Sequence, residues 1–174
     1  MDKLLLEYPW ISKIVTLSKD VGLDWLMMTC LALELSGGDP RCRTLDKEFL
    51  FDTLGPDSPL FAGYWDQGMP SINVIDLGTR WGLFQILGRV AVETGAFTGR
   101  LINFTDIGAN VKAAVTIARN TIQKGGTEED VIKYFGADPN RVYALMNESR
   151  HSITILLTIG LDDEELIEAP VVEA

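Results

Sequence analysis

The sequence has few of the residues on which metal sites and nucleophilic sites usually depend. It contains two cysteines, Cys30 and Cys42, and one histidine, His151. Two cysteines are too few for a disulfide framework, and their spacing is not that of a metal site. A Ser-His-Asp or Cys-His site would need His151, which lies in no recognisable motif. We therefore expect no metal, no cofactor and a plain buried thiol at Cys30.

Long apolar runs and an excess of positive charge are also lacking. The longest apolar stretches, 25–33 and 153–159, are shorter than the ~20 residues that span a bilayer. Glu7 interrupts the leucines near the start, which a secretory signal would not do. The net charge is -10 and no run of Lys or Arg stands out, which disfavours nucleic acid as a partner. These patterns predict no signal peptide, no membrane insertion and no nucleic-acid binding.

What is present is the composition of one globular domain, with 174 residues of which 47% are hydrophobic. Apolar periodicity predicts a first helix over 9–19 and a second over 24–36, which ends at a Gly-Gly pair. Further helices are predicted after a cap at Thr105 or Asp106, after Thr127, and from Pro139. Residues 152–159 suit either a strand or a buried helix. We expect a mainly helical domain over 1–160 and a solvated acidic tail over 161–174.

The segment 39–79 resists assignment to regular structure. It contains four prolines, several glycines and five aromatic residues. Loops of this length in a compact domain often act as lids or binding walls. The segment is thus either a candidate for substrate contact or a surface insertion without a role.

Glu34 is the only charged residue between Asp24 and Asp39, and it lies in the last turn of an otherwise apolar predicted helix. A helix that is apolar all round is usually buried. Burial and the partial negative charge at a helix C-terminus both favour a protonated carboxyl group. Such a group can donate a proton to the leaving oxygen of a glycosidic bond. The alternative is a frayed helix end at which Glu34 reaches water.

A second polar residue in apolar surroundings occurs in Trp81-Gly82-Leu83-Phe84-Gln85-Ile86. Gly82 allows close backbone approach or an unusual dihedral angle. Gln85 can bond a sugar amide or hydroxyl, although a polar residue that opens a helix is also common.

The order of several segments along the chain points to a family resemblance. Residues 8–24 and 31–40 are followed by 81–86, by Asn110 with the helix after it, by Tyr134-Phe135-Gly136, and by Tyr143. In order and rough spacing, from about residue 8 to residue 146, they resemble the soluble lytic transglycosylase domain of the lysozyme-like superfamily. Residues 81–86 match its Gly-Leu-Met-Gln motif, and Tyr134-Phe135-Gly136 stands at its Tyr-Asn-x-Gly motif.

The resemblance implies an all-α, lysozyme-like fold with a long irregular insertion before the Gly-Leu-Phe-Gln segment. It implies that Glu34 is the single general acid/base, that Tyr134 bonds its carboxyl group, and that Ser36, Phe84 and Gln85 contact substrate with Tyr134. In that family the acid protonates the bond between N-acetylmuramic acid and N-acetylglucosamine. It then acts as a base while the substrate closes its own 1,6-anhydro ring, so water is not consumed.

Three departures from the family pattern stand out. The family usually has Ser directly after the catalytic Glu, whereas here Leu35 intervenes before Ser36. A rigid alignment of 36–40 would place Leu35 at the catalytic position, but leucine cannot transfer a proton, so we favour a one-residue slip in the turn. Phe135 replaces the family's Asn, and the insertion over 41–79 is longer than usual.

That insertion carries two aspartates, Asp66 and Asp76. A glycoside hydrolase usually requires a second carboxylate within ~5–10 Å of the first. Asp76 is the candidate for this role in a goose-type lysozyme-like hydrolase, and a turn or capping role is its alternative.

These observations leave three hypotheses for function. The first is a peptidoglycan lytic transglycosylase that uses Glu34 alone, and the second is a muramidase that uses Glu34 with Asp76. The third is an inactive glycan-binding or structural module. For the enzyme we expect a monomer that acts on the glycan strands of the bacterial cell wall. Because no export signal is evident, we expect a bacteriophage protein of the virion or of host lysis.

Overall fold

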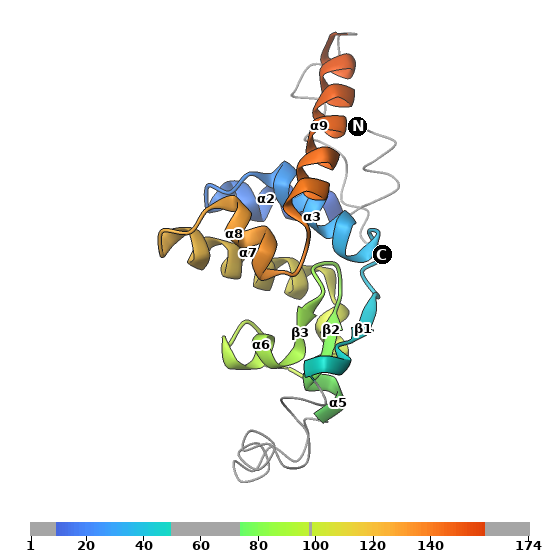
Figure 1. The fold of residues 1–174 in the computed structure, drawn as a ribbon, viewed down its shortest axis with the longest axis vertical. Helices are drawn as coiled ribbons and strands as arrows, with labels where there is room; N and C mark the ends of the chain where they lie inside the picture. The colour runs from blue at the N-terminus through green and yellow to red at the C-terminus, as the bar shows by residue number, and fades with distance from the viewer. Residues whose placement is uncertain (1–9, 50–73, 98, 159–174) are drawn as a thin grey trace.

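The computed structural model describes residues 10–49, 74–97 and 99–158, and within them the chain is mainly helical, as the sequence predicts (Figure 1). The chain begins with helices α2 (Trp10–Asp20) and α3 (Trp25–Ser36) and strand β1 (Arg43–Leu45). The middle consists of α5 (Val74–Leu77), β2 (Thr79–Trp81), β3 (Ile86–Leu87) and α6 (Gly88–Glu93). The 3-10 helix η2 (Leu101–Thr105) then leads to α7 (Ile107–Gln123), α8 (Glu128–Tyr134) and α9 (Pro139–Thr158).

Local capping chemistry explains where several helices begin. The Asp24 carboxylate accepts the backbone N–H groups of Leu26 and Met27 at the start of α3. Asp106 caps α7 in the same way, and Thr127 forms a reciprocal capping box at the start of α8. All three helices therefore begin where the sequence predicts.

The last helix settles one question that periodicity left open. Helix α9 continues to Thr158, so the part of 152–159 that is described is helical and not a strand. The expected acidic tail over 161–174 and Asp66 lie outside the described residues. None of the helices in the described ranges is long and apolar enough to cross a bilayer.

A small antiparallel sheet occupies part of the segment that the sequence left unassigned. Its order is β1-β2-β3, with Arg43 paired to Trp81 and Trp81 paired to Ile86. Strands of two or three residues are too short to show the alternation by which strands are recognised. The expectation of a purely irregular insertion is therefore corrected for the strand Arg43–Leu45, for the helix Val74–Leu77, and for the strand Thr79–Trp81, which contains the last residue of the segment.

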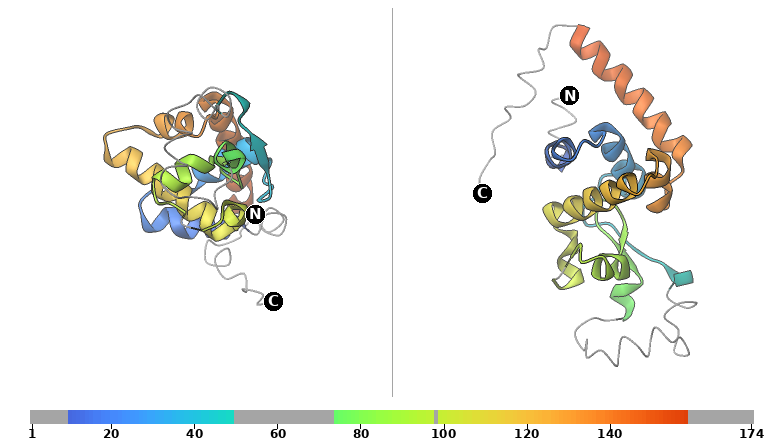
Figure 2. Two further views of the ribbon diagram at one scale, coloured as in Figure 1. Left: turned by 90° about the horizontal axis from the view of Figure 1, so that it is seen from below. Right: turned by 90° about the vertical axis from the view of Figure 1, so that its left-hand side faces the viewer.

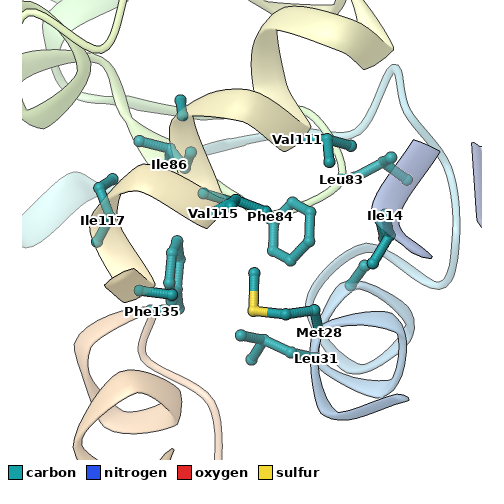
Figure 3. Close-up of a cluster of buried hydrophobic side chains, with 14 of the residues drawn as sticks. Ile14, Met28, Leu31, Leu83, Phe84, Ile86, Val111, Val115, Ile117 and Phe135 are labelled. Carbon is teal, nitrogen blue, oxygen red and sulfur yellow. The ribbon is translucent and has the colours of Figure 1, made fainter. Parts of the chain in front are cut away.

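The elements form two groups that meet at α7. Helices α2, α3, α8 and α9 lie on one side of α7, whereas the sheet, α5 and α6 lie on the other (Figures 1 and 2). Phe84, in the turn between β2 and β3, packs among the helices on the other side of α7. The centroid of its ring lies 5.9 Å from that of Phe135. Figure 3 shows Phe84 in the cluster of buried side chains that also contains Met28, Leu31 and Val115.

Phe84 was expected to contact substrate, but its side chain is fully buried. It therefore has no exposed surface for a sugar and serves to anchor the turn in the core. Burial of a phenylalanine side chain contributes about 1.5–3 kcal/mol.

Candidate functional site

Glu34 lies in the last turn of α3, which continues intact to Ser36 and ends at Gly37. The helix end is therefore not frayed. The Glu34 side chain is only 14% exposed, and its Oε1 lies 3.1 Å from Nη1 of Arg141 in the first turn of α9. This partner was not predicted from the sequence. The carboxyl group that we expected to stand alone is held by a guanidinium from the other end of the chain.

Ser36 is engaged by the helix to which it belongs. Its hydroxyl donates to the carbonyl oxygen of Ala32 at 2.8 Å and accepts the backbone N–H of Gly38 at 3.2 Å. The Gly38 carbonyl oxygen in turn accepts the indole N–H of Trp10 at 3.0 Å. Ser36 thus closes the end of α3 next to Glu34, and its donor is not free for a substrate.

Gln85 ends a strained turn. Residues 82–85, called the Gln85 turn below, connect β2 to β3, and Gln85 has a φ of +46°. Among the described residues it is the only one other than glycine with a positive φ. A left-handed conformation of this kind costs about 1–3 kcal/mol and is concentrated at functional sites. The turn therefore carries strain that its surroundings must hold in place.

The Gln85 side chain is buried, and its amide is held in one orientation. The Nε2 group donates to the carbonyl oxygens of Cys42 at 3.1 Å and Gly82 at 2.8 Å. Because two carbonyl acceptors require the NH2 group, the opposite atom must be the oxygen Oε1. Among the hydrogen bonds between described residues, none reaches Oε1.

Asn110 of α7 holds the same turn from the core side and is fully buried. Its Oδ1 accepts the backbone N–H of Phe84 at 3.0 Å, and its Nδ2 donates to the carbonyl oxygens of Trp81 at 2.9 Å and Phe104 at 3.3 Å. A Cβ at Gly82 would lie 2.6 Å from Cγ of Asn110. Only glycine fits at 82, both for this approach and for its φ of +71°.

A short stretch of chain joins the two candidate residues. The Cys42 carbonyl oxygen accepts both the backbone N–H of Gly82 at 2.9 Å and the Gln85 amide. Cys42 itself follows the end of α3 by a few residues. The Gln85 turn is therefore tied to the segment that leads directly away from Glu34.

Tyr134 is the last residue of α8, and Phe135 follows it as the C-cap. Tyr134 is half exposed and meets the buried Phe135 ring edge-on at 5.7 Å. Among the hydrogen bonds of the described residues, none joins Tyr134 to Glu34. The contact that the resemblance assigns to a tyrosine is made in this structure by Arg141.

Asp76 is not brought to Glu34. It belongs to α5, which lies beyond the sheet at the end away from α3 (Figures 1 and 2). Its backbone carbonyl oxygen accepts the indole N–H of Trp81 at 3.0 Å. The structure thus gives Asp76 a part in packing α5 against the sheet.

A partly buried ion pair links strand β2 to the residue that directly follows β1. Both Nε and Nη2 of Arg80 contact Oδ2 of Asp46, at 3.1 and 2.9 Å. The backbone N–H of Phe49 donates to the other carboxylate oxygen at 3.0 Å. This hydrogen bond, with help from the Arg80 guanidinium, lowers the pKa of Asp46, while partial burial opposes the shift. Arg80 also lies near Gly136, in the connection between α8 and α9, because a Cβ at Gly136 would lie 3.9 Å from its Nη1.

Cys30 has the surroundings of an inert thiol. It is fully buried in α3, and burial raises its pKa to about 11. In the described part of the chain, no three His, Cys, Asp or Glu side chains gather as metal ligands would.

No family model, curated protein or solved structure matches this chain.

Proposed function

We propose that the protein cleaves the glycan strands of peptidoglycan as a lytic transglycosylase, with Glu34 as the only general acid/base. The observation that carries the proposal is the setting of Glu34. Its carboxyl group is largely buried at the end of an apolar helix and lies close along the chain to the segment that binds the Gln85 turn.

In the first step, the Glu34 carboxyl group gives its proton to the glycosidic oxygen as the bond from that oxygen to C1 of N-acetylmuramic acid breaks. In the second step, the resulting carboxylate takes the proton of the substrate's own 6-hydroxyl, whose oxygen forms the new bond to C1. Glu34 ends as it began, and water is not consumed. Proton transfer by one positioned side chain contributes about 10²–10⁴-fold to a rate.

Gln85 is suited to hold the sugar during these steps. Its Oε1 is fixed by the two bonds to Nε2 and can accept a hydrogen bond from a hydroxyl or acetamido N–H group. An acceptor held in advance does not have to be ordered when the substrate binds.

The first test compares purified wild-type protein with Glu34→Gln on isolated peptidoglycan. We expect release of soluble products with 1,6-anhydromuramic ends, seen by mass spectrometry, and a loss of about 10²–10⁴-fold in Glu34→Gln. Glu129→Gln is a matched control, because Glu129 lies in an exposed ion pair with Lys133 on α8. Circular dichroism should show that both variants remain folded.

Two outcomes would replace the proposal. Products with reducing ends would show hydrolysis and would make the protein a muramidase that needs a second carboxylate. Binding to peptidoglycan without cleavage, unchanged in Glu34→Gln, would show a glycan-binding module.

A further inference from the structure

Arg141 combines a contact to Glu34 with an exposed guanidinium. Its side chain is 70% exposed, whereas Glu34 is 14% exposed, and the two are joined only through Nη1 and Oε1. A guanidinium has five N–H donors in a planar fork. Within the described ranges the one ion pair of Arg141 is with Glu34, and its side chain is 70% exposed, so donors of the fork are open to solvent beside the carboxyl group.

A role in folding gives a weak account of this residue. Ion pairs with one strongly exposed partner contribute little to stability, because solvent screens them and long side chains lose freedom. The pair Arg80–Asp46 is different, because two guanidinium nitrogens contact the carboxylate and neither side chain is more than a third exposed. Arg141 is the arginine that remains open beside Glu34.

We propose that Arg141 binds an anionic group of the substrate next to the scissile bond and so determines a preference for glycans that carry carboxylates. This inference rests on the proposed function. Peptidoglycan strands bear carboxylates on their peptide stems, and arginine pairs with carboxylates through two parallel N–H groups. The pairing also offsets an electrostatic repulsion. A protein with a net charge of -10 repels an anionic polymer unless a local cation binds that polymer.

The contact with Oε1 gives Arg141 a second effect on the same reaction. With Oε1 held by the guanidinium, Oε2 is the oxygen left to carry the transferred proton. Arg141 is in this respect a positioning residue, and the carboxylate of the substrate and the carboxyl group of Glu34 share its fork. A substrate without the anionic group would lose the first effect and retain the second.

The test uses two short glycans that differ only in charge, one with free stem carboxylates and one with the same carboxylates amidated. For Arg141→Gln we expect KM for the charged glycan to rise roughly tenfold, as for the loss of one charge-assisted contact. KM for the amidated glycan should change much less, and any fall in kcat should be the same for both. Arg141→Lys should recover part of the charged-glycan affinity, because it restores the charge without the fork. Arg119→Gln, at an exposed position on α7, is the matched control and should change neither.

Two results would overturn the inference while leaving the proposed function intact. Equal changes in KM on both glycans would show that Arg141 acts only through Glu34, and no change on either would show that it has no role. If the wild-type protein cleaves neither glycan, the proposed function fails, and calorimetric binding of the same pair decides the inference separately. Weaker binding of the charged glycan alone by Arg141→Gln would support it, and equal binding would refute it.

Discussion

The Glu34 pair, formed by Glu34 and Arg141, and the Gln85 turn are held in place in opposite ways. The pair depends on one contact between a largely buried carboxyl group and a largely exposed guanidinium. The turn is fixed by buried hydrogen bonds from Asn110, by the Cys42 carbonyl oxygen, and by the burial of Phe84. Glu34 thus has a partner, Arg141, that a ligand can reach. Asn110 and Phe84, which hold the Gln85 turn, are buried and out of reach of a ligand.

This difference has a physical basis. An acid/base must change its charge during a reaction, so its partner must tolerate both states and the approach of substrate. An acceptor that positions a sugar gains from rigidity, because order present before binding is not lost on binding. Substitutions in the turn should therefore act mainly on stability, and substitutions in the pair should act mainly on activity.

The largest expected effect on stability is that of Gly82→Ala. We expect it to lower the free energy of unfolding by about 3–5 kcal/mol, since it combines the left-handed strain of a Cβ with a clash at Asn110. Gly22→Ala is a matched control, because Gly22 has a similar φ of +73° with nothing within 4 Å of the added Cβ. It should cost about 1–2 kcal/mol. Urea unfolding measures both, and equal values would show that Asn110 moves away without penalty.

A smaller effect should distinguish strain from hydrogen bonding at position 85. Both Gln85→Ala and Gln85→Gly remove the amide, but only glycine relieves the positive φ. We expect Gln85→Gly to be the more stable of the two by about 1 kcal/mol, with the same loss of activity in both. If the alanine variant unfolds at the same urea concentration as the glycine variant, the turn has relaxed and is not strained by Gln85.

The smallest effect concerns Asp46, which follows β1 and pairs with Arg80 of β2. Its pKa is lowered in the folded protein, so its contribution to stability is present above the ordinary value of about 3.9 and is lost as the pH falls through the lowered value. Asp46→Asn should therefore be less stable than wild type at pH 7, with the difference shrinking below pH ~4. Thermal unfolding across this range measures the difference, with Asp20→Asn at the exposed end of α2 as the control. A difference that does not change with pH would refute the assigned cause.

Much of the helical framework was predictable from short segments of sequence. Asp24, Asp106 and Thr127 cap their helices through side-chain bonds to residues two or three positions later, so the signal is local. Gly82 was noted as a residue that allows close approach or an unusual dihedral angle, and the structure has both, although the group that approaches it, Asn110, could not be identified from the sequence. The short strands were missed because their pairing partners lie in other parts of the chain.

The candidate site was predictable only in part. Glu34 was found because a lone charge in an apolar helix is unusual in any sequence. The expectation that Phe84 contacts substrate was wrong, since an aromatic residue in an apolar segment is equally suited to the core. The orientation of the Gln85 amide could not be foreseen, because it is set by the Cys42 carbonyl oxygen and by a backbone angle.

The sequence by itself determined the helices, their caps and the position of Glu34 at a helix end, because each follows from residues within a few turns of one another. Only the tertiary structure decided that Arg141 forms an ion pair with Glu34, that Asp76 lies away from Glu34, and that Asn110 holds the Gln85 turn through hydrogen bonds. Contacts of this kind join residues far apart in the chain, and their formation depends on how the packed helices bring those residues together. The partner of a buried carboxyl group is therefore a property of the fold.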